Sequence, residues 1–168
     1  MIHYKHIVCI ILLVVAPRVL HGQISDSLRQ AVLGDHRLTL QWLDNQNRGK
    51  FGKCLIFEDK GKQKLDGYQE EKVGGQKNYL RMAGTIVILK ARELAFTGTI
   101  TTRISYINGG REHVRKGKFT FRAHGKRRYW RMQNQREQPD GDAEVIDYID
   151  IHFKGPKDTL RPPKNNHG

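Results

Sequence analysis

The sequence predicts a mainly β fold: a single antiparallel up-and-down β-barrel, or a flattened sandwich, of roughly seven or eight strands with one short N-terminal helix. Downstream of residue 36, apolar and polar residues alternate with a period of two over much of the chain, as they do in half-buried strands. The alternating segments are joined mostly by short turns that contain glycine. Consecutive antiparallel strands bury one face and hide their edges only by closing into a barrel or by packing against a second sheet.

The helix is predicted directly before the strands. Ser25 or Asp26 can cap its N-terminus, and Gly34 can end it. Between these residues, apolar side chains recur at helical spacing at Leu28, Ala31 and Val32. The first strand follows at once, and its predicted core face holds Leu38, Leu40 and Trp42.

The clearest strand spans residues 96–106, where threonine and β-branched residues are frequent. Its predicted core face holds Phe96, Gly98, Ile100, Thr102, Ile104 and Tyr106. The next residues, 108–110, are Asn-Gly-Gly and predict a turn, because Asn and Gly tolerate positive φ. Farther on, residues 134–142 are polar and predict an exposed loop, and a last strand is predicted from Val145 to Phe153.

In general shape, an up-and-down barrel of this size resembles the lipocalin-type barrels. The resemblance covers the architecture alone, because the Gly-x-Trp motif that opens lipocalins is absent. Trp42 follows Leu40 and Gln41, so no glycine stands where that motif needs one. The resemblance therefore implies a barrel and no particular ligand.

The N-terminus has the pattern of a secretory signal peptide. Its apolar run, Ile7–Ala16, is ten residues long, about half of the ~20 residues that a membrane-spanning helix needs. We expect residues 1–22 to be removed by cleavage after Gly22. Residues 23–155 then form a single β domain, and residues 156–168 form a disordered basic tail. This predicts a secreted or periplasmic protein without a transmembrane anchor.

A basic stretch between Arg111 and Arg131 is the most informative part of the chain for function. The whole chain has a formal net charge of +13, and this stretch holds nine Lys or Arg residues and one acid, Glu112. Because like charges repel at short range, such a cluster predicts an acidic partner that offsets the repulsion. A solvated face that keeps the protein soluble is the alternative. The predicted ligand-binding residues are Arg115, Lys116, Lys118, Arg122, Lys126, Arg127, Arg128 and Arg131.

These features predict a secreted or periplasmic binding module whose arginine-rich surface takes an acidic ligand: an anionic glycan, a lipid head group or an acidic protein. Export argues against a nucleic-acid partner. One alternative is a glycan-acting hydrolase that uses Asp147 and Asp150, although two residues at this spacing on one strand point to opposite faces. Another is a structural envelope component without a ligand. The sequence does not indicate an oligomeric state.

Asp147 falls on the apolar face of the predicted last strand, where an unpaired carboxylate would be costly. We therefore predict a buried structural pair between Asp147 and Arg131, or alternatively Arg128, on the preceding strand. Cys54 lies in an apolar run and is predicted to be buried. Neither a cofactor nor a metal is predicted, because the histidines lack ligand spacing and no phosphate-binding loop is present.

Overall fold

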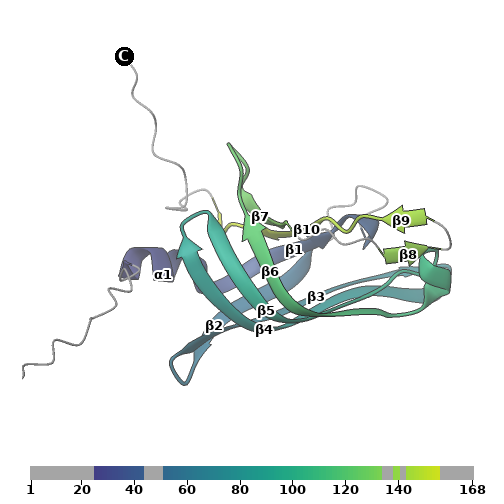
Figure 1. The fold of residues 1–168 in the computed structure, drawn as a ribbon, viewed down its shortest axis with the longest axis horizontal. Helices are drawn as coiled ribbons and strands as arrows, with labels where there is room; N and C mark the ends of the chain where they lie inside the picture. The colour runs from purple at the N-terminus through teal and green to yellow at the C-terminus, as the bar shows by residue number, and fades with distance from the viewer. Residues whose placement is uncertain (1–24, 44–50, 134–137, 141–142, 156–168) are drawn as a thin grey trace, which may run out of the picture.

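The structure, a computed structural model, describes residues 25–43, 51–133, 138–140 and 143–155 (Figure 1). The predicted signal peptide, its cleavage site after Gly22 and the predicted C-terminal tail lie outside the described residues. None of the helices in the described part is long and apolar enough to cross a membrane.

The molecule is a closed antiparallel β-barrel with strand order β1-β10-β7-β6-β5-β4-β3-β2. Its strands are β1 (Gly34–Leu40), β2 (Gly52–Asp59), β3 (Lys62–Val73), β4 (Gln76–Lys90), β5 (Glu93–Arg103), β6 (His113–Arg122), β7 (Tyr129–Met132) and β10 (Ile149–His152). Seven of the eight pairs of neighbouring barrel strands follow each other along the chain, and the eighth pair, β1 with β10, closes the barrel. The predicted mainly β barrel with one short helix is confirmed, and closure of the sheet excludes the flattened sandwich.

Tight turns join the long central strands. Between β2 and β3, Lys60 and Gly61 both have positive φ, 50° and 73°. That combination gives a two-residue turn whose twist matches the flanking strands. The predicted turn after β5 is also confirmed: Asn108–Gly110 forms a short 3-10 turn, η2, with positive φ at all three residues.

Helix α1 (Asp26–Val32) lies at one end of the barrel, and the small hairpin β8 (Gln138–Asp140) and β9 (Ala143–Val145) lies at the other (Figure 1). Ser25 caps the helix, because its Oγ accepts a hydrogen bond from the Leu28 amide at 3.3 Å. Val32 is fully buried. His36 of β1 ties the helix to the barrel through a 2.7 Å contact between Nε2 and the Val32 carbonyl oxygen.

Large apolar side chains fill the middle of the barrel, with Phe96, Phe121 and Trp130 fully buried. A barrel of eight strands has an interior about wide enough for its own side chains. The predicted core face that begins at Phe96 in β5 is confirmed up to Ile104, whereas Tyr106 lies beyond the strand and is exposed.

Three local predictions need correction. Trp42 lies in a 3-10 turn, η1 (Gln41–Leu43), and not on a strand. The predicted last strand is divided into β9 and β10, because β9 pairs with β8 in a separate two-stranded sheet and β10 belongs to the barrel. The predicted loop 134–142 includes β8; its other residues, 134–137 and 141–142, lie outside the described part.

Candidate functional site

Barrel closure places residues from both ends of the chain on one outer face of β7, β10 and β1. Tyr129 of β7 lies opposite His152 of β10, which lies opposite Arg37 of β1. In the adjacent row, Arg131 lies opposite Asp150. Because alternate residues of a strand point to the same side, these side chains project outward while Trp130 and Ile151 point into the core.

Cationic and aromatic groups alternate along this face. The Arg37 guanidinium carbon lies 4.3 Å from the centre of the Phe51 ring. The Arg131 guanidinium lies 5.1 Å from the Tyr129 ring and 4.6 Å from the Tyr148 ring, distances typical of cation–π contacts. We call this surface the arginine–aromatic face; its members are Arg37, Phe51, Arg127, Tyr129, Arg131, Tyr148 and His152.

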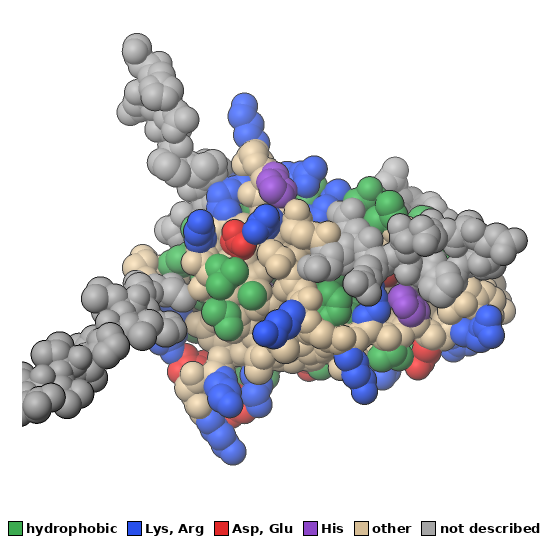
Figure 2. Space-filling view, viewed as in Figure 1, with side chains coloured by type: hydrophobic (Ala, Val, Ile, Leu, Met, Phe, Trp, Pro, Cys, Tyr) green, Lys and Arg blue, Asp and Glu red, His purple; other side chains and the backbone are tan. Residues whose placement is uncertain are grey.

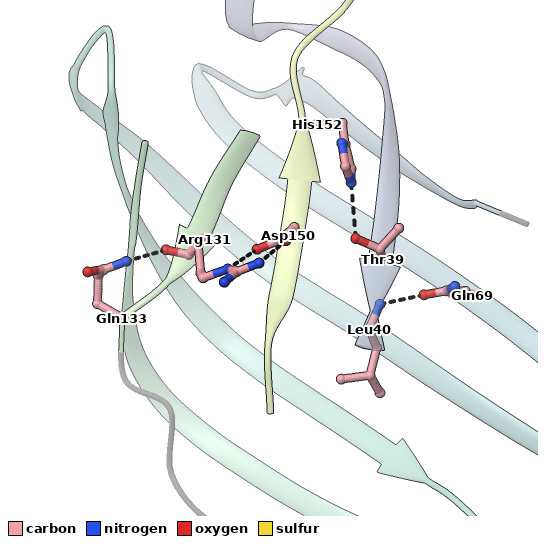
Figure 3. Close-up of polar contacts among 7 residues, drawn as sticks. All are labelled: Thr39, Leu40, Gln69, Arg131, Gln133, Asp150 and His152. Carbon is pink, nitrogen blue, oxygen red and sulfur yellow. Dashed lines mark hydrogen bonds and ion pairs between the residues drawn. The ribbon is translucent and has the colours of Figure 1, made fainter. Parts of the chain in front are cut away.

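His152 connects the two halves of the face. Its ring centre lies 5.3 Å from that of Phe51 and 5.5 Å from that of Tyr129. Its Nε2 lies 3.0 Å from Thr39 Oγ1, within hydrogen-bond distance (Figure 3). Burial holds the pKa of His152 below its ordinary value of 6.5; Arg37 and Arg131 act in the same direction, whereas Asp150 opposes them. His152 is therefore neutral at pH 7, and arginines carry the positive charge of the face.

The Arg131 guanidinium is held in place by a two-pronged ion pair with Asp150. Its Nε and Nη2 each donate to one carboxylate oxygen at 2.7 Å (Figure 3). This hydrogen bonding to Asp150 is the main reason that the pKa of Arg131 is raised. The pair neutralises much of the charge of Arg131, so this residue acts on the face chiefly as a flat surface between the Tyr129 and Tyr148 rings.

An open groove of about 1170 Å³ adjoins the face at Arg37 and Phe51. Its lining also includes two further cationic residues, Lys53 and Lys154, and one acid, Asp35. The groove is wide enough for a small ligand or for a segment of a polymer. Groove and face together form the candidate site.

The basic loop between β6 and β7 borders this site. Figure 2 shows Lys and Arg side chains gathered around that loop. Lys126, Arg127 and Arg128 are exposed there, as a ligand-binding role requires. Arg127 stands 5.8 Å from the Tyr129 ring, and Arg128 donates from Nη2 to the Gly155 carbonyl oxygen at 2.8 Å, next to the groove.

The other predicted ligand-binding residues lie elsewhere on β6. Lys116 and Lys118 are exposed on the outer face, opposite Thr99 and Thr97 of β5 and away from the groove. Arg122 also points outward, opposite Arg131, and pairs with Glu93 at 2.9 Å. The basic stretch therefore divides into separate groups and does not form one patch.

The prediction for Arg115 was wrong. Arg115 shares the inward face of β6 with Phe119 and Phe121, so it is buried and not available as a surface contact. The expected pairing of Asp147 is corrected for the same reason. Asp147 is fully buried as predicted, but its partner is Arg115, with Nη2 to Oδ2 at 2.7 Å. Arg131 points outward to Asp150 and Arg128 contacts Gly155, so neither pairs with Asp147.

Other chemistry receives little support from the described residues. Asp147 and Asp150 lie on opposite sides of the sheet, each held by an arginine, so they do not converge as a hydrolase pair would. Within the described part of the chain, no three His, Cys, Asp or Glu side chains gather as a metal site needs. Cys54 is buried as predicted, and burial, with the Asp66 carboxylate, raises the pKa of its thiol to about 12.

Sequence reasoning missed Arg37, Phe51, Lys53 and His152. They stand outside the basic stretch. The local signal for Arg37, Lys53 and His152 is the outward phase of their strands, and Phe51 directly precedes β2. What brings them to the site is the contact between β1 and β10, which no local pattern specifies.

Comparison with known proteins places the chain in one family. The family model described as the PM1083 family matches residues 21–153. A protein of Pasteurella multocida (strain Pm70), named Uncharacterized protein PM1083, is 34% identical over 132 residues, covering 75% of this chain and 76% of that protein. No solved structure matches the chain. The chain belongs to the PM1083 family.

Proposed function

We propose that this protein is an exported binding module that holds a segment of an acidic glycan in the groove and across the arginine–aromatic face. The main support for the proposal is that the groove and the arginine–aromatic face are continuous. Arg37 and Phe51 belong both to the groove lining and to the face. A polymer that leaves the groove would therefore meet alternating guanidinium and aromatic groups.

Each part of the site matches one part of such a ligand. Guanidinium groups bind carboxylate or sulfate through two parallel hydrogen bonds. Flat rings such as Phe51 and Tyr129 offer an apolar surface on which a sugar ring can lie. Among the described residues, the groove lining carries three cations, Arg37, Lys53 and Lys154, against one acid, Asp35, so it favours anions.

The direct test is titration of the mature protein with polygalacturonate, a regular polymer of sugar rings that each carry a carboxylate. The site variant is Arg37→Gln/Arg127→Gln. Each exposed ion contact contributes about 0.5–1 kcal/mol, so we expect the double variant to bind roughly tenfold more weakly. Isothermal calorimetry at low salt measures the change.

The matched control is Lys116→Gln/Lys118→Gln, which removes the same charge from the outer face of β6 opposite Thr99 and Thr97. This control should bind nearly as well as the natural sequence. Equal weakening in both variants would mean that net charge, and not this site, determines binding. Poly-glutamate provides the second comparison: it has carboxylates but no rings, and it should bind more weakly at equal charge.

A further inference from the structure

A second group of polar side chains lies toward the end of the barrel where β3 turns into β4. The β8–β9 hairpin lies at the same end (Figure 1). Glu71 and Asn78 face each other across β3 and β4, and Thr102 faces His113 across β5 and β6. We call this layer the polar ring; its members are Gln69, Glu71, Asn78, Thr102, His113, Arg115 and Asp147. It is distinct from the arginine–aromatic face, which lies on the outside of the barrel.

Part of the ring is held by contacts within the protein. The Arg115–Asp147 pair is joined by Trp42, whose Nε1 donates to Asp147 Oδ1 at 3.0 Å. Asn78 Oδ1 accepts from the Ser105 amide at 2.7 Å. These contacts fix the side chains in position, so the ring is organised before any ligand arrives.

Among the buried atoms of the ring that have no hydrogen-bond partner within the described part of the chain are Glu71 Oε2, Asn78 Nδ2 and His113 Nδ1. Asn78 is fully buried, so its amide hydrogens cannot reach bulk solvent. Buried polar atoms are nearly always paired in folded proteins, and a group of exceptions at one place calls for a partner. Their grouping on β3, β4 and β6 at one end of the barrel defines where that partner would lie.

The chemistry of these atoms selects the kind of partner. The NH2 group at Asn78 Nδ2 can only donate and the Glu71 carboxylate can only accept, whereas a hydroxyl group does both. Burial and the nearby Arg115 lower the pKa of His113, so its ring is neutral at pH 7 and can also donate or accept. Because Asp147 balances Arg115, the charge left over is that of Glu71, and an anion would be repelled.

Two aromatic residues, Trp42 and Tyr106, lie beside the polar ring. The Tyr106 hydroxyl donates to the Trp42 carbonyl oxygen at 2.8 Å. This hydrogen bond links the residues just before η2 to η1. Tyr106 is 46% exposed. Partial burial, and then the Glu71 carboxylate, raise the pKa of Tyr106. Aromatic surface next to a few directed polar groups is the usual composition of a small-molecule site.

From this arrangement we propose that the polar ring binds a neutral ring compound rich in hydroxyl groups, that is, a single uncharged sugar unit. Its hydroxyls would accept from Asn78 Nδ2, donate to Glu71 Oε2 and bond His113 Nδ1. Its ring would lie against Trp42 and Tyr106.

The test is nitrogen–proton NMR of the mature protein titrated separately with glucose, galactose and N-acetylglucosamine at millimolar concentrations. We expect at least one sugar to shift the Trp42 indole and Asn78 amide signals in a saturable way. His113→Phe should weaken that sugar's binding about tenfold, since a hydrogen bond left unmade in a buried site costs about this much. Asn78→Leu should do the same, and its melting temperature shows whether the loss of the Ser105 contact has unfolded it.

The control is His124→Phe, the same change in the exposed β6–β7 loop at the other end of the barrel, and it should leave sugar binding unchanged. If none of the three sugars moves the Trp42 and Asn78 signals, the ring holds only water and the proposal is wrong. It is equally wrong if His113→Phe and His124→Phe bind the sugar alike. Binding of polygalacturonate to the outer face is measured separately, and neither histidine variant should change it.

Discussion

At the scale of single residues, the buried pair of Arg115 and Asp147 has the largest consequences for stability. Burial lowers the pKa of Arg115, and the Asp147 carboxylate opposes that effect. The Asp147 carboxylate, 2.7 Å from Arg115 Nη2, compensates the buried charge of the guanidinium. Removal of one partner would leave the other as an uncompensated buried charge.

Asp147→Asn should therefore lower the free energy of unfolding by about 3–5 kcal/mol. The control is Asp150→Asn, which breaks the partly exposed pair with Arg131 and should cost about 1 kcal/mol. Urea unfolding at pH 7 measures both. Equal costs for the two variants would show that Arg115 does not depend on Asp147.

His152 predicts a pH dependence of stability. Because burial holds its pKa in the folded protein below 6.5, the unfolded chain takes up its proton first as the pH falls. The free energy of unfolding should thus decrease below about pH 6.5, and less so in His152→Phe. His113 shifts in the same direction and accounts for part of the decrease that remains. Urea midpoints across the range test this; an identical pH profile in His152→Phe would contradict it.

Cys54 should be inert in the folded protein. Its side chain is 1% exposed and its thiol pKa is raised to about 12, so almost no thiolate forms at pH 8. Ellman's reagent should react with it only after unfolding by guanidinium chloride. Full reaction of the native protein within minutes would show that β2 opens readily.

At the scale of elements, β4 and β5 approach closely where Gly84 faces Gly98. A methyl group added at Gly84 would lie 2.3 Å from the Thr97 carbonyl oxygen and 2.7 Å from the Gly98 Cα atom. The ring of Phe96 covers the same place, at 2.9 Å from the added atom. These glycines allow the long hairpin to coil tightly around the core.

Gly84→Ala should lower the free energy of unfolding by about 3 kcal/mol, at the upper end for an overpacked core, because backbone atoms cannot move aside easily. The neighbouring exposed change Thr85→Ala should stay within about 0.5 kcal/mol. Thermal unfolding compares them. A tolerated Gly84→Ala would mean that β4 and β5 can separate without cost.

Most strands could be predicted because alternation is a local property. The inward phase of β4, β5 and β6 follows directly from Leu80, Phe96 and Phe121 and their period-two neighbours. By the same alternation Arg115 points inward with Phe119 and Phe121, so its burial could have been predicted from the sequence of β6 alone. The division between β9 and β10 could not, because it depends on their different partners: β9 pairs with β8, and β10 pairs with β1 and β7.

At the scale of the whole molecule, closure of β1 against β10 makes the candidate site. Thr39 and His152 are 113 positions apart in the chain, yet their side chains lie 3.0 Å apart. The same contact places the Arg37 guanidinium and the basic β6–β7 loop on one side of the barrel. A surface with several exposed cations on one side binds an anionic polymer in a salt-dependent way.

Binding of polygalacturonate should accordingly weaken as salt rises from about 50 mM to about 300 mM, where the screening length falls well below the width of the site. The Arg37→Gln/Arg127→Gln variant should show a shallower dependence, since fewer cations contact the polymer. Titrations at several salt concentrations give the two slopes. A steep slope that is the same in both proteins would place the binding site elsewhere on the barrel.

The sequence by itself determined the mainly β class, the capped helix, the turns and the inward or outward phase of most strands, because each depends on residues close together in the chain. Only the tertiary structure decided that Asp147 meets Arg115, that Asp150 meets Arg131, and that Arg37 joins the basic loop. Those neighbours lie on different strands, and their contact depends on the register at which the barrel closes. Register is a property of the whole sheet, so no local pattern in the chain contains it.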